Sequence, residues 1–468
     1  MAKGEAQVNT IGLLAQAICA ADTGSVSPAA IEQAKLLLLD TIGCGFAGRA
    51  EPAAQAVLNT ISELQGPCAV IGQTARTSMM GAVLANGVLV RVLDLNDYII
   101  GEAHGEPESG GHPSDNIPVA LAAGAARKRS GRETLAAIAL GYELYARLQH
   151  AMDRAGPWDG VTVSGLVAPA IAGRLMGLSE PRMAHAVALG AARAATPSIV
   201  RTGDISAAKS LSNALVAQSG LQAAMLAEHG ATGPIAILDD ARGLRDLLVH
   251  LDARVLCAPF LSDGAIMRAH VKAYPCINTG QSAVAAALKL HAMLGSKAAS
   301  LARIEVTMAD YNVTKRHQDD PERRQPASRE AADHSFPFVV AVALMDGRFG
   351  AAQFEHERWR DERVTALMER IVLRRDATWN ARAPGSYPCS IRAIDAEGIE
   401  HRVEVAYPPG YSQAGLDANI VLDKFHGVTE SILDRADRTR IVDTVMEFDQ
   451  CPSAEALNAA IAIEGKSK

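Results

Sequence analysis

Apolar residues recur at the spacing of an α-helix over most of the first 262 positions. The pattern predicts helices over residues 8–21 and 28–48, and Ser27 followed by Pro28 has the residue types preferred at a helix start. Further helices are expected at about 51–65, from Ser78 onward, at 117–129 and 131–150, and through the Ala- and Gly-rich stretch that follows. The pattern therefore predicts that this part of the chain forms one helical domain.

The pattern changes near residue 263, where apolar and polar residues begin to alternate. Residues 302–313 and 371–377 alternate as half-buried strands do, and residues 390–407 alternate on both sides of a hairpin-type turn at 396–398. Helical spacing returns over 417–462. We therefore predict a mainly α-helical domain (residues 1–264), a smaller α+β lid domain (265–408) and C-terminal helices (409–468) that rejoin the helical domain.

Residues 94–116, with the sequence DLNDYIIGEAHGEPESGGHPSDN, interrupt the helical pattern. We expect a long irregular loop here, and loops of this length are usually functional or disordered. Pro113 disfavours helix at His112, and the residues after it are good N-caps, so His112 is expected just before a helix N-terminus, where anions are favoured. The alternative is an ordered surface loop with ordinary caps.

Composition and charge narrow the function. A chain of 468 residues is expected to form two domains, and its net charge of −7 argues against a nucleic-acid partner. Its seven cysteines include no CxxC pair, so neither a cysteine-bound metal nor a disulfide framework is expected. No signal peptide and no uncharged apolar run of about 18 residues is evident, so we expect a cytoplasmic protein without a membrane partner.

Charged residues that suit carboxylate chemistry gather in four segments. The first holds Asp94, Asp97 and His112, in which an acid could fix the tautomer of a histidine. The second holds Arg201 and Lys209, which offer a planar fork and a point charge for carboxylates. The third begins at Lys272 and includes Tyr274 and Gln281, and the fourth is REAADHS at 329–335. A lone lysine or histidine is more often structural, so each segment alone is a weak signal.

Together, and in this order, the four segments resemble the MmgE/PrpD family, in particular its 2-methylcitrate dehydratase branch. They are similar to that branch's D-x-x-D followed by HPSDN, its R-x-G-E-L-S-x-W-K, its K-x-[YF]-P and its R-E-T-A-D-H-S. The resemblance implies a two-domain fold and proton abstraction beside a carboxylate, without a metal or other cofactor. Asp94 and His112 would do acid–base work, while Lys209 and Lys272 would bind carboxylates and stabilise an enolate, with Lys272 also a candidate acid. The implied substrate-binding residues are Asp97, His104, Ser114, Arg201, Tyr274 and Gln281.

One departure from the branch concerns the reaction itself. The branch carries a histidine in G-F-D-H-V-T, where this chain has Gly160 in the run 157–162, and His104 is a candidate replacement. The first hypothesis is a lyase that dehydrates a small di- or tricarboxylate in the manner of 2-methylcitrate dehydratase. A decarboxylase of the cis-aconitate type, an epimerase or isomerase of a small dicarboxylate, and a non-catalytic homologue remain alternatives. The resemblance also implies a homodimer.

Overall fold

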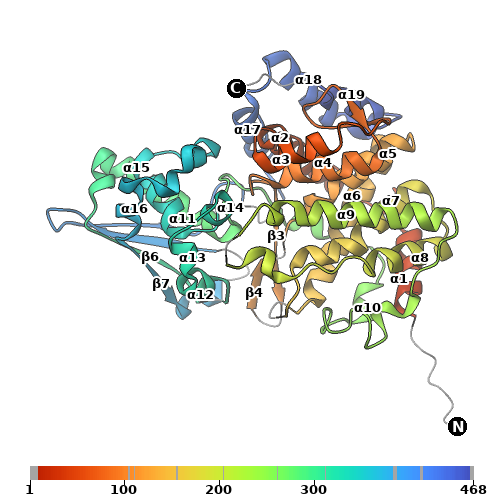
Figure 1. The fold of residues 1–468 in the computed structure, drawn as a ribbon, viewed down its shortest axis with the longest axis horizontal. Coiled ribbons are helices and arrows are strands. Elements are labelled where there is room, and N and C mark those ends of the chain that lie inside the picture. Colours follow the sequence, from red (N-terminus) through yellow and green to blue (C-terminus); the bar gives the residue numbers. More distant parts are fainter. Residues whose placement is uncertain are drawn as a thin grey trace, which may run out of the picture.

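The computed structural model describes residues 9–463, apart from 104–105, 110, 154–155, 204, 261, 311, 383–386 and 412–414. A helix-rich lobe and a smaller lobe with a β-sheet lie side by side along the longest axis (Figure 1). The predicted fold class, a helical domain with a smaller α+β domain, is confirmed. None of the helices in the described residues is long and apolar enough to span a bilayer.

The larger lobe is built from helices of both ends of the chain. Its helices are α1 (Thr10–Ala20), α2 (Pro28–Gly48), α3 (Pro52–Thr60), α4 (Met79–Arg91), α5 (Ile117–Ala126), α6 (Gly131–Ala151), α7 (Ser164–Met176), α8 (Glu180–Ala191), α9 (Ala208–Glu228), α10 (Ala253–Leu256), α17 (Ala418–Thr429), α18 (Arg435–Met446) and α19 (Glu455–Ile461). The expected helix start is present, because the Ser27 side chain accepts a hydrogen bond from Ala30 N.

Small residues let these helices approach closely, as the sequence suggested. A Cβ added to Gly220 of α9 would lie 2.7 Å from the Ala168 Cβ of α7. A Cβ added to Gly190 of α8 would lie 2.3 Å from the Gly165 carbonyl oxygen of α7. Helices α7, α8 and α9 therefore pack at distances that a larger side chain at either position would not permit.

The smaller lobe is organised around a four-stranded sheet in the described residues, with strand order β7-β6-β8-β9. Strands β6 and β7 are parallel, and the other pairs are antiparallel. Its elements are β6 (Arg303–Ala309), β7 (Ile371–Asp376), β8 (Cys389–Ile394), β9 (Glu400–Val405), α11 (Gln281–Leu294), α12 (Asn312–Asp319), α13 (Pro321–Arg324), α14 (Arg329–Ala332), α15 (Phe336–Asp346) and α16 (Glu362–Met368). The predicted strands and the hairpin turn between β8 and β9 are confirmed.

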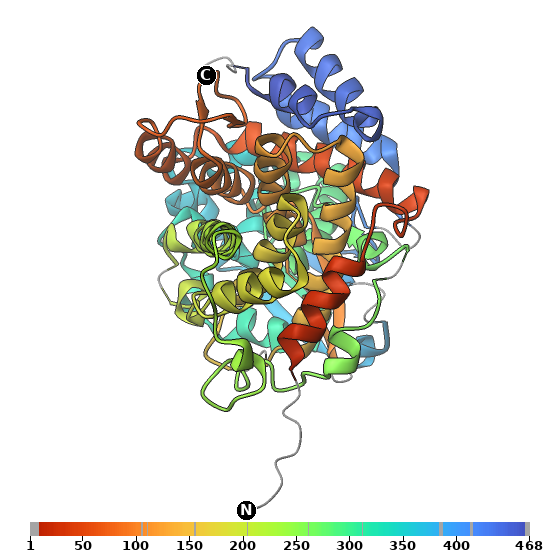
Figure 2. The ribbon, with the colours of Figure 1, turned by 90° about the vertical axis from the view of Figure 1, so that its right-hand side faces the viewer.

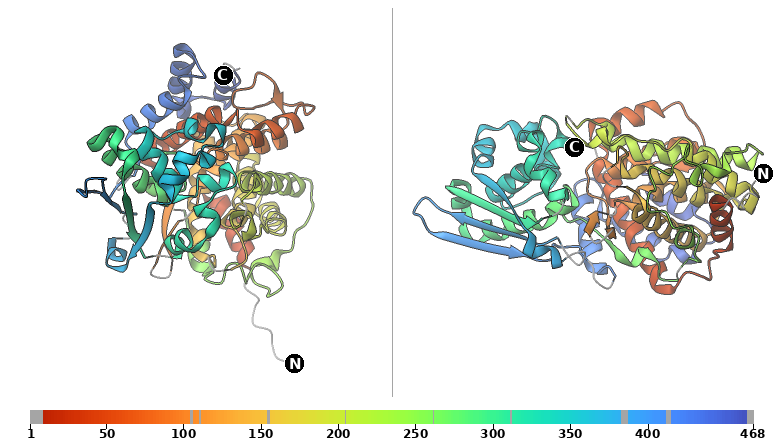
Figure 3. Two further views of the ribbon diagram at one scale, coloured as in Figure 1. Left: turned by 60° about the vertical axis from the view of Figure 1, so that its left-hand side comes forward. Right: turned by 90° about the horizontal axis from the view of Figure 1, so that it is seen from below.

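Each lobe has its own hydrophobic core. The first core draws on residues from Ile11 to Val271 and again from Val421 to Ile461, whereas the second draws on residues from Cys276 to Val405. Helix α17 packs on α2, so the C-terminal helices, blue in Figure 2, lie beside the N-terminal ones. Figure 3 shows the strands of the smaller lobe from two further sides. The domain boundaries at 264/265 and 408/409 stay a prediction from the sequence.

Three local predictions were wrong. Part of the expected loop at 94–116 is a hairpin of β3 (Tyr98–Ala103) and β4 (Glu106–Ser109). Residues 98–99 also pair with β5 (Ala269–His270), and the local sequence pattern cannot reveal so distant a partner. The charged stretch 315–335 lacks a clear periodicity and is expected to be a loop, but it holds the end of α12 together with α13 and α14, whose shortness and charge hid them. Helix α3 ends at Thr60, and the residues from Ser62 to Pro67 are exposed, so they offer no apolar face that would extend the helix against the core.

The remaining short elements complete the described fold. They are the strand pair β1 (Cys68–Ala69) and β2 (Arg76–Thr77), and 3₁₀ turns that include η1 (Pro113–Asn116), η2 (Gly160–Val163) and η3 (Ser198–Arg201). All seven cysteines are free, so the prediction of no disulfide is confirmed.

Candidate active site

Asp94 lies just beyond the C-terminal end of α4, at the junction of the two lobes. Its backbone has φ of 50°, a left-handed conformation that is strained for a residue with a side chain. The turn is closed by a hydrogen bond from Asp94 N to the Arg91 carbonyl oxygen, at 3.0 Å. The carboxylate is almost completely buried, so it needs partners that compensate its charge.

Two lysines from distant parts of the chain provide that compensation. Lys272, just after β5, places Nζ 2.6 Å from Asp94 Oδ1 and also donates to the Asp94 carbonyl oxygen at 2.9 Å. Lys209, in the first turn of α9, places Nζ 3.3 Å from Asp94 Oδ2. Burial alone would raise the pKa of Asp94, but Lys272, Lys209 and Arg91 hold it well below its usual range. Burial lowers the pKa of Lys272, an effect that Asp94 partly offsets.

His112 is held in one tautomer beside this cluster. Its Nδ1 lies 2.6 Å from the Asp97 carbonyl oxygen, which can only accept, so Nδ1 carries the hydrogen and Nε2 carries a lone pair. Nε2 lies 3.9 Å from Asp94 Oδ1. Burial, followed by Arg91 and Lys272, holds the pKa of His112 well below its usual range. The geometry therefore presents a neutral imidazole base beside the Asp94 carboxylate, which two ammonium groups flank.

The turn before His112 depends on a glycine. Gly111 has φ of 79°, and a Cβ there would lie 2.3 Å from the Tyr145 hydroxyl oxygen. That hydroxyl accepts a hydrogen bond from His112 N at 3.2 Å. Tyr145 and Tyr142, which the sequence showed as a pair at helical spacing on α6, thus both reach the residues 97–112, since Tyr142 donates to Asp97.

The smaller lobe contributes Asp333 and His334, which sequence reasoning did not assign to the site. Lys209 Nζ lies 2.6 Å from Asp333 Oδ1 and 3.1 Å from His334 Nδ1. His334 Nδ1 contacts the Asp333 carboxylate and lies 3.7 Å from Asp94 Oδ2. The signal was available, because both residues belong to the fourth charged segment of the sequence.

Asp94, Asp333 and His334 lie close enough together to hold a metal ion. The Lys209 ammonium is within 3.3 Å of one atom of each of these residues. It already supplies a positive charge at the place where the three ligand atoms converge. Asp94, Asp333 and His334 therefore fit a site with the Lys209 ammonium at its centre better than a site for a divalent cation.

Arg91 and Asn96 connect the loop at 94–97 to η1 by hydrogen bonds. Neither residue was predicted as a site residue. Arg91 Nη1 donates to Asp94 Oδ1 at 2.9 Å and to Asn96 Oδ1 at 3.2 Å. Asn96 Nδ2 donates to Ser114 Oγ at 2.9 Å and to Asp115 Oδ1 at 2.8 Å. These side chains are buried, so the loop is fixed by hydrogen bonds that water does not compete for.

Asp97 and Ser114, predicted to bind substrate, lie within this framework. Asp97 Oδ1 accepts from Ser114 N at 3.3 Å, and Oδ2 accepts from the Tyr142 hydroxyl at 2.8 Å. Burial raises the pKa of Asp97 to about 7 despite these donors. Both side chains thus support the loop that carries Asp94 and His112, and their contact with substrate stays a prediction.

The other predicted binding residues contact groups outside the Asp94 cluster. Gln281 accepts from Ala273 N and Tyr274 N at 3.0 and 3.1 Å, so it fixes the chain just after Lys272. The Tyr274 side chain packs against the core of the smaller lobe. Arg201 is paired with Asp159 at 2.6 Å, next to the glycine that replaces the expected histidine. His104 lies outside the described residues.

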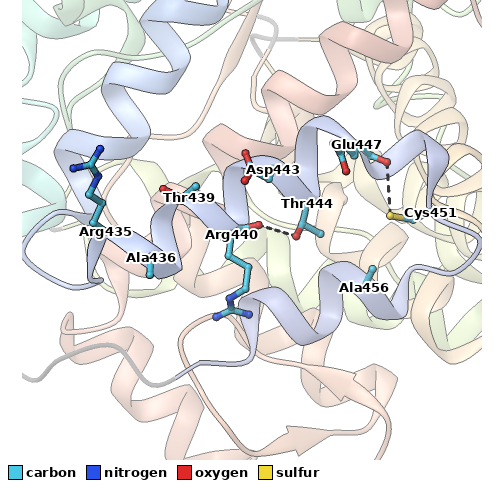
Figure 4. Close-up of a pocket in the computed structure, with 9 residues that line it drawn as sticks. All are labelled: Arg435, Ala436, Thr439, Arg440, Asp443, Thr444, Glu447, Cys451 and Ala456. Carbon is cyan, nitrogen blue, oxygen red and sulfur yellow. Dashed lines mark hydrogen bonds between the residues drawn. The ribbon is translucent and has the colours of Figure 1, made fainter.

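A surface groove of about 770 Å³ lies elsewhere, on α18 and α19 (Figure 4). It is lined by residues between Arg435 and Ala456, and none of the lysines of the buried cluster is among them. The groove carries Arg435 and Arg440 beside Asp443 and Glu447. Among the described residues, its lining includes neither a lysine nor a histidine, whereas both kinds of side chain meet Asp94 at the lobe junction.

Two domains of one known protein family match most of the chain. The MmgE/PrpD N-terminal domain matches residues 12–254, and the MmgE/PrpD C-terminal domain matches residues 274–448. The chain belongs to the MmgE/PrpD family. Both matched regions contribute to the site, since Asp94, His112 and Lys209 lie in the first and Asp333 in the second.

Relatives in this family carry two kinds of enzyme name. The chain is 25% identical to a 2-methylcitrate dehydratase of Salmonella typhimurium over 465 residues, which cover 92% of this chain and 93% of the relative. It is 24% identical to a cis-aconitate decarboxylase-like protein of Aspergillus oryzae, with 93% of each chain covered. It is 26% identical to the cis-aconitate decarboxylase of Homo sapiens, with 77% of this chain and 75% of the relative covered. The family thus supports an enzyme of the dehydratase or decarboxylase type.

Proposed function

We propose that this protein is a lyase that dehydrates a small di- or tricarboxylate, with a substrate similar to 2-methylcitrate. The observation that supports this most directly is the arrangement around Asp94. A neutral imidazole with a free Nε2 lies 3.9 Å from a carboxylate that two buried ammonium groups flank. Such a site pairs a base with fixed positive charge, as proton abstraction beside a carboxylate requires.

The reaction would proceed through an enolate. His112 Nε2 takes the proton from the carbon beside a substrate carboxylate, and the electron pair moves into that carboxylate, where the Lys209 and Lys272 ammonium groups stabilise it. The pair then forms the carbon–carbon double bond, and hydroxide leaves with a proton from Lys272, so that water is released. The lowered pKa of Lys272 makes it a better proton donor than an ordinary lysine. Return of the proton from His112 to Lys272 restores the enzyme.

Asp94 would serve this acid–base step in its ionised form. Its pKa is held well below the usual range, so it remains a carboxylate at neutral pH. From 3.9 Å it stabilises the imidazolium that His112 becomes after taking the proton. Its contacts at 2.6 and 3.3 Å also fix the directions of the two lysine side chains.

Substrate access requires movement, because Lys209, Lys272 and Asp94 are all buried. The cluster joins the lobes through Lys209 and Asp333, and Arg329 of the smaller lobe pairs with Glu51 of the larger one at 3.2 Å. We therefore propose that the smaller lobe is a lid that opens for the substrate and closes to exclude water during catalysis.

Decarboxylation is the second candidate, because two of the relatives described above are named cis-aconitate decarboxylases or similar to them. It would use the same cations, but the carboxylate would leave as CO2 and the carbanion would take a proton. An epimerase would instead return the proton to the same carbon. In dehydration the carbanion expels hydroxide, in decarboxylation it forms by loss of CO2, and in epimerisation it only regains a proton.

An NMR assay of the purified protein in D2O distinguishes the candidates. The substrates are 2-methylcitrate, citrate, cis-aconitate and smaller hydroxy diacids, with EDTA present. An alkene product supports the dehydratase, whereas loss of CO2 moves the assignment to a decarboxylase and deuterium exchange without elimination moves it to an epimerase. No reaction with any of them would contradict the proposed function.

We further propose a cytoplasmic homodimer that needs no cofactor. Abundant small-residue helices suit large helical interfaces, and Lys209 provides the charge that a metal would otherwise supply. A monomer mass in light scattering at micromolar concentration would contradict the dimer.

A further inference from the structure

A third lysine, Lys424 of α17, reaches the loop that carries Asp94. Its Nζ donates to the Leu95 carbonyl oxygen at 2.8 Å and lies 2.5 Å from Asp40 Oδ1 of α2. The side chains of Lys424 and Asp40 are 8% and 0% exposed, so the pair is inside the larger lobe. The C-terminal helices thus contact the candidate site through one charged side chain.

Lys424 adds to a row of contacts with backbone carbonyl groups between residues 94 and 97 of the loop. Lys272 binds the Asp94 carbonyl oxygen and Lys424 binds the next one, that of Leu95. Two residues further on, the Asp97 carbonyl oxygen accepts from His112 Nδ1. The direction of these carbonyl groups therefore determines where the Asp94 carboxylate lies and which tautomer His112 adopts.

Stability alone explains this pair poorly. A buried ion pair loses hydration that its attraction only partly regains, and well-packed apolar residues often replace such pairs without loss of stability. Neither carboxylate oxygen of Asp40 has a hydrogen-bond partner in the described residues. The Lys424 ammonium, 2.5 Å from Oδ1, compensates the charge of the carboxylate as an ion-pair partner. Burial raises the pKa of Asp40, and Lys424 is the main opposing influence. The geometric consequence of the pair is that the ammonium is directed at Leu95.

We propose that Lys424 is a positioning residue of the active site, with Asp40 as its counter-ion. Lys424 fixes the backbone at Leu95, and through it the Asp94 carboxylate and the hydrogen bond that sets the His112 tautomer. The effect on turnover rests on the proposed function, whereas the effect on the His112 tautomer does not.

The test compares Lys424→Met, Lys424→Arg and the double variant Asp40→Asn/Lys424→Met. The double variant leaves no buried charge unpaired, so it separates loss of stability from loss of positioning. Lys35→Met is the matched control, because Lys35 is a buried lysine of α2 that pairs with Glu32 and Asp449 at 2.7 and 2.6 Å, and neither partner belongs to the loop. Thermal unfolding, kcat and KM are measured for each variant. Ring ¹⁵N NMR reads the His112 tautomer, assigned by its absence in His112→Gln.

We expect both variants with Met at position 424 to lose on the order of 10²-fold in kcat, the scale for a displacement of about 1 Å in an active site. Their His112 ring signals should shift toward a mixture of tautomers. The double variant should recover most of the Tm but not the kcat, Lys424→Arg should retain activity, and Lys35→Met should lower Tm while kcat is unchanged.

A double variant with the kcat and the His112 signals of the unmodified protein would overturn the proposal. If the unmodified protein converts no substrate, the proposed function fails, and the NMR comparison alone decides whether Lys424 positions His112.

Discussion

Asp97 allows a quantitative test of the electrostatics beneath the site. Burial raises its pKa to about 7 in the folded protein, against 3.8 for an ordinary aspartate. The folded protein therefore keeps a proton on Asp97 at pH values where the unfolded chain has lost it. The stabilisation by this proton is complete below about pH 4 and is lost as the pH rises to about 7. The difference between the two pKa values corresponds to about 4 kcal/mol, an upper figure for one buried group.

Asp97→Asn removes the titration with little change of shape. We expect the stability difference between Asp97→Asn and the unmodified protein to shift in favour of the variant between pH 4 and pH 8, by up to about 4 kcal/mol. Urea unfolding at several pH values measures this difference, in which the titration of other groups cancels. Tyr142→Phe removes a donor that lowers the pKa of Asp97, so it should move the titration to higher pH. A difference that does not vary with pH would refute the reasoning, because Asp97 would then be ionised in the folded protein.

Three further predictions concern turnover. His112→Gln should lose at least about 10²-fold in kcat and in exchange of the substrate proton with D2O, measured by NMR, while its circular dichroism is unchanged. In a pH profile, kcat/KM should not fall as the pH is lowered from 8 to 6, because burial holds the pKa of His112 well below 6.5. On the alkaline side, kcat/KM should fall at a pH below 10.5, because Lys272 has a lowered pKa and loses its proton there. Treatment with EDTA followed by gel filtration should leave kcat unchanged, and recovery of lost activity by a divalent cation would contradict the role given to Lys209.

The sequence predicted the fold class and most of the groups that meet at the lobe junction, for different physical reasons. Helical and alternating periodicities predicted the two kinds of lobe. Asp94, His112, Lys209 and Lys272 stood out because the segments that hold them resemble, in this order, those of the MmgE/PrpD family.

What the sequence did not predict depends on contacts between distant segments. Arg91 at the end of an apolar helix looks like an ordinary surface charge, but its guanidinium is buried against Asp94. The pairing of β3 with β5, which joins Ile99 to Ala269 170 positions further along the chain, turned an expected loop into a hairpin. Asp40 interrupts an apolar helical stretch, which favours a buried acid, yet nothing near it in sequence indicates Lys424 as its partner.

The charge balance of the site leads to a last prediction. Lys209, Lys272 and Arg91 face Asp94 and Asp333 in a buried cluster, so the cations are already largely paired before substrate binds. A tricarboxylate would bring further negative charge into this cluster, where an uncompensated charge is costly. Uptake of a proton by a neutral group of the site is the simplest compensation.

His334 is the group placed to take up that proton. Burial, followed by Lys209, lowers its pKa to about 4, so it is neutral at pH 7 when the site is empty. A substrate carboxylate beside Lys209 would raise this pKa by neutralising the ammonium that opposes protonation. We expect calorimetric titration with the substrate at pH 7, in buffers of different ionisation enthalpy, to show uptake of about one proton, and His334→Gln to reduce it. Binding heats that are independent of the buffer would show that the lysine cluster accepts the substrate without a change of protonation, and that the cations of the closed site are less completely paired than their distances indicate.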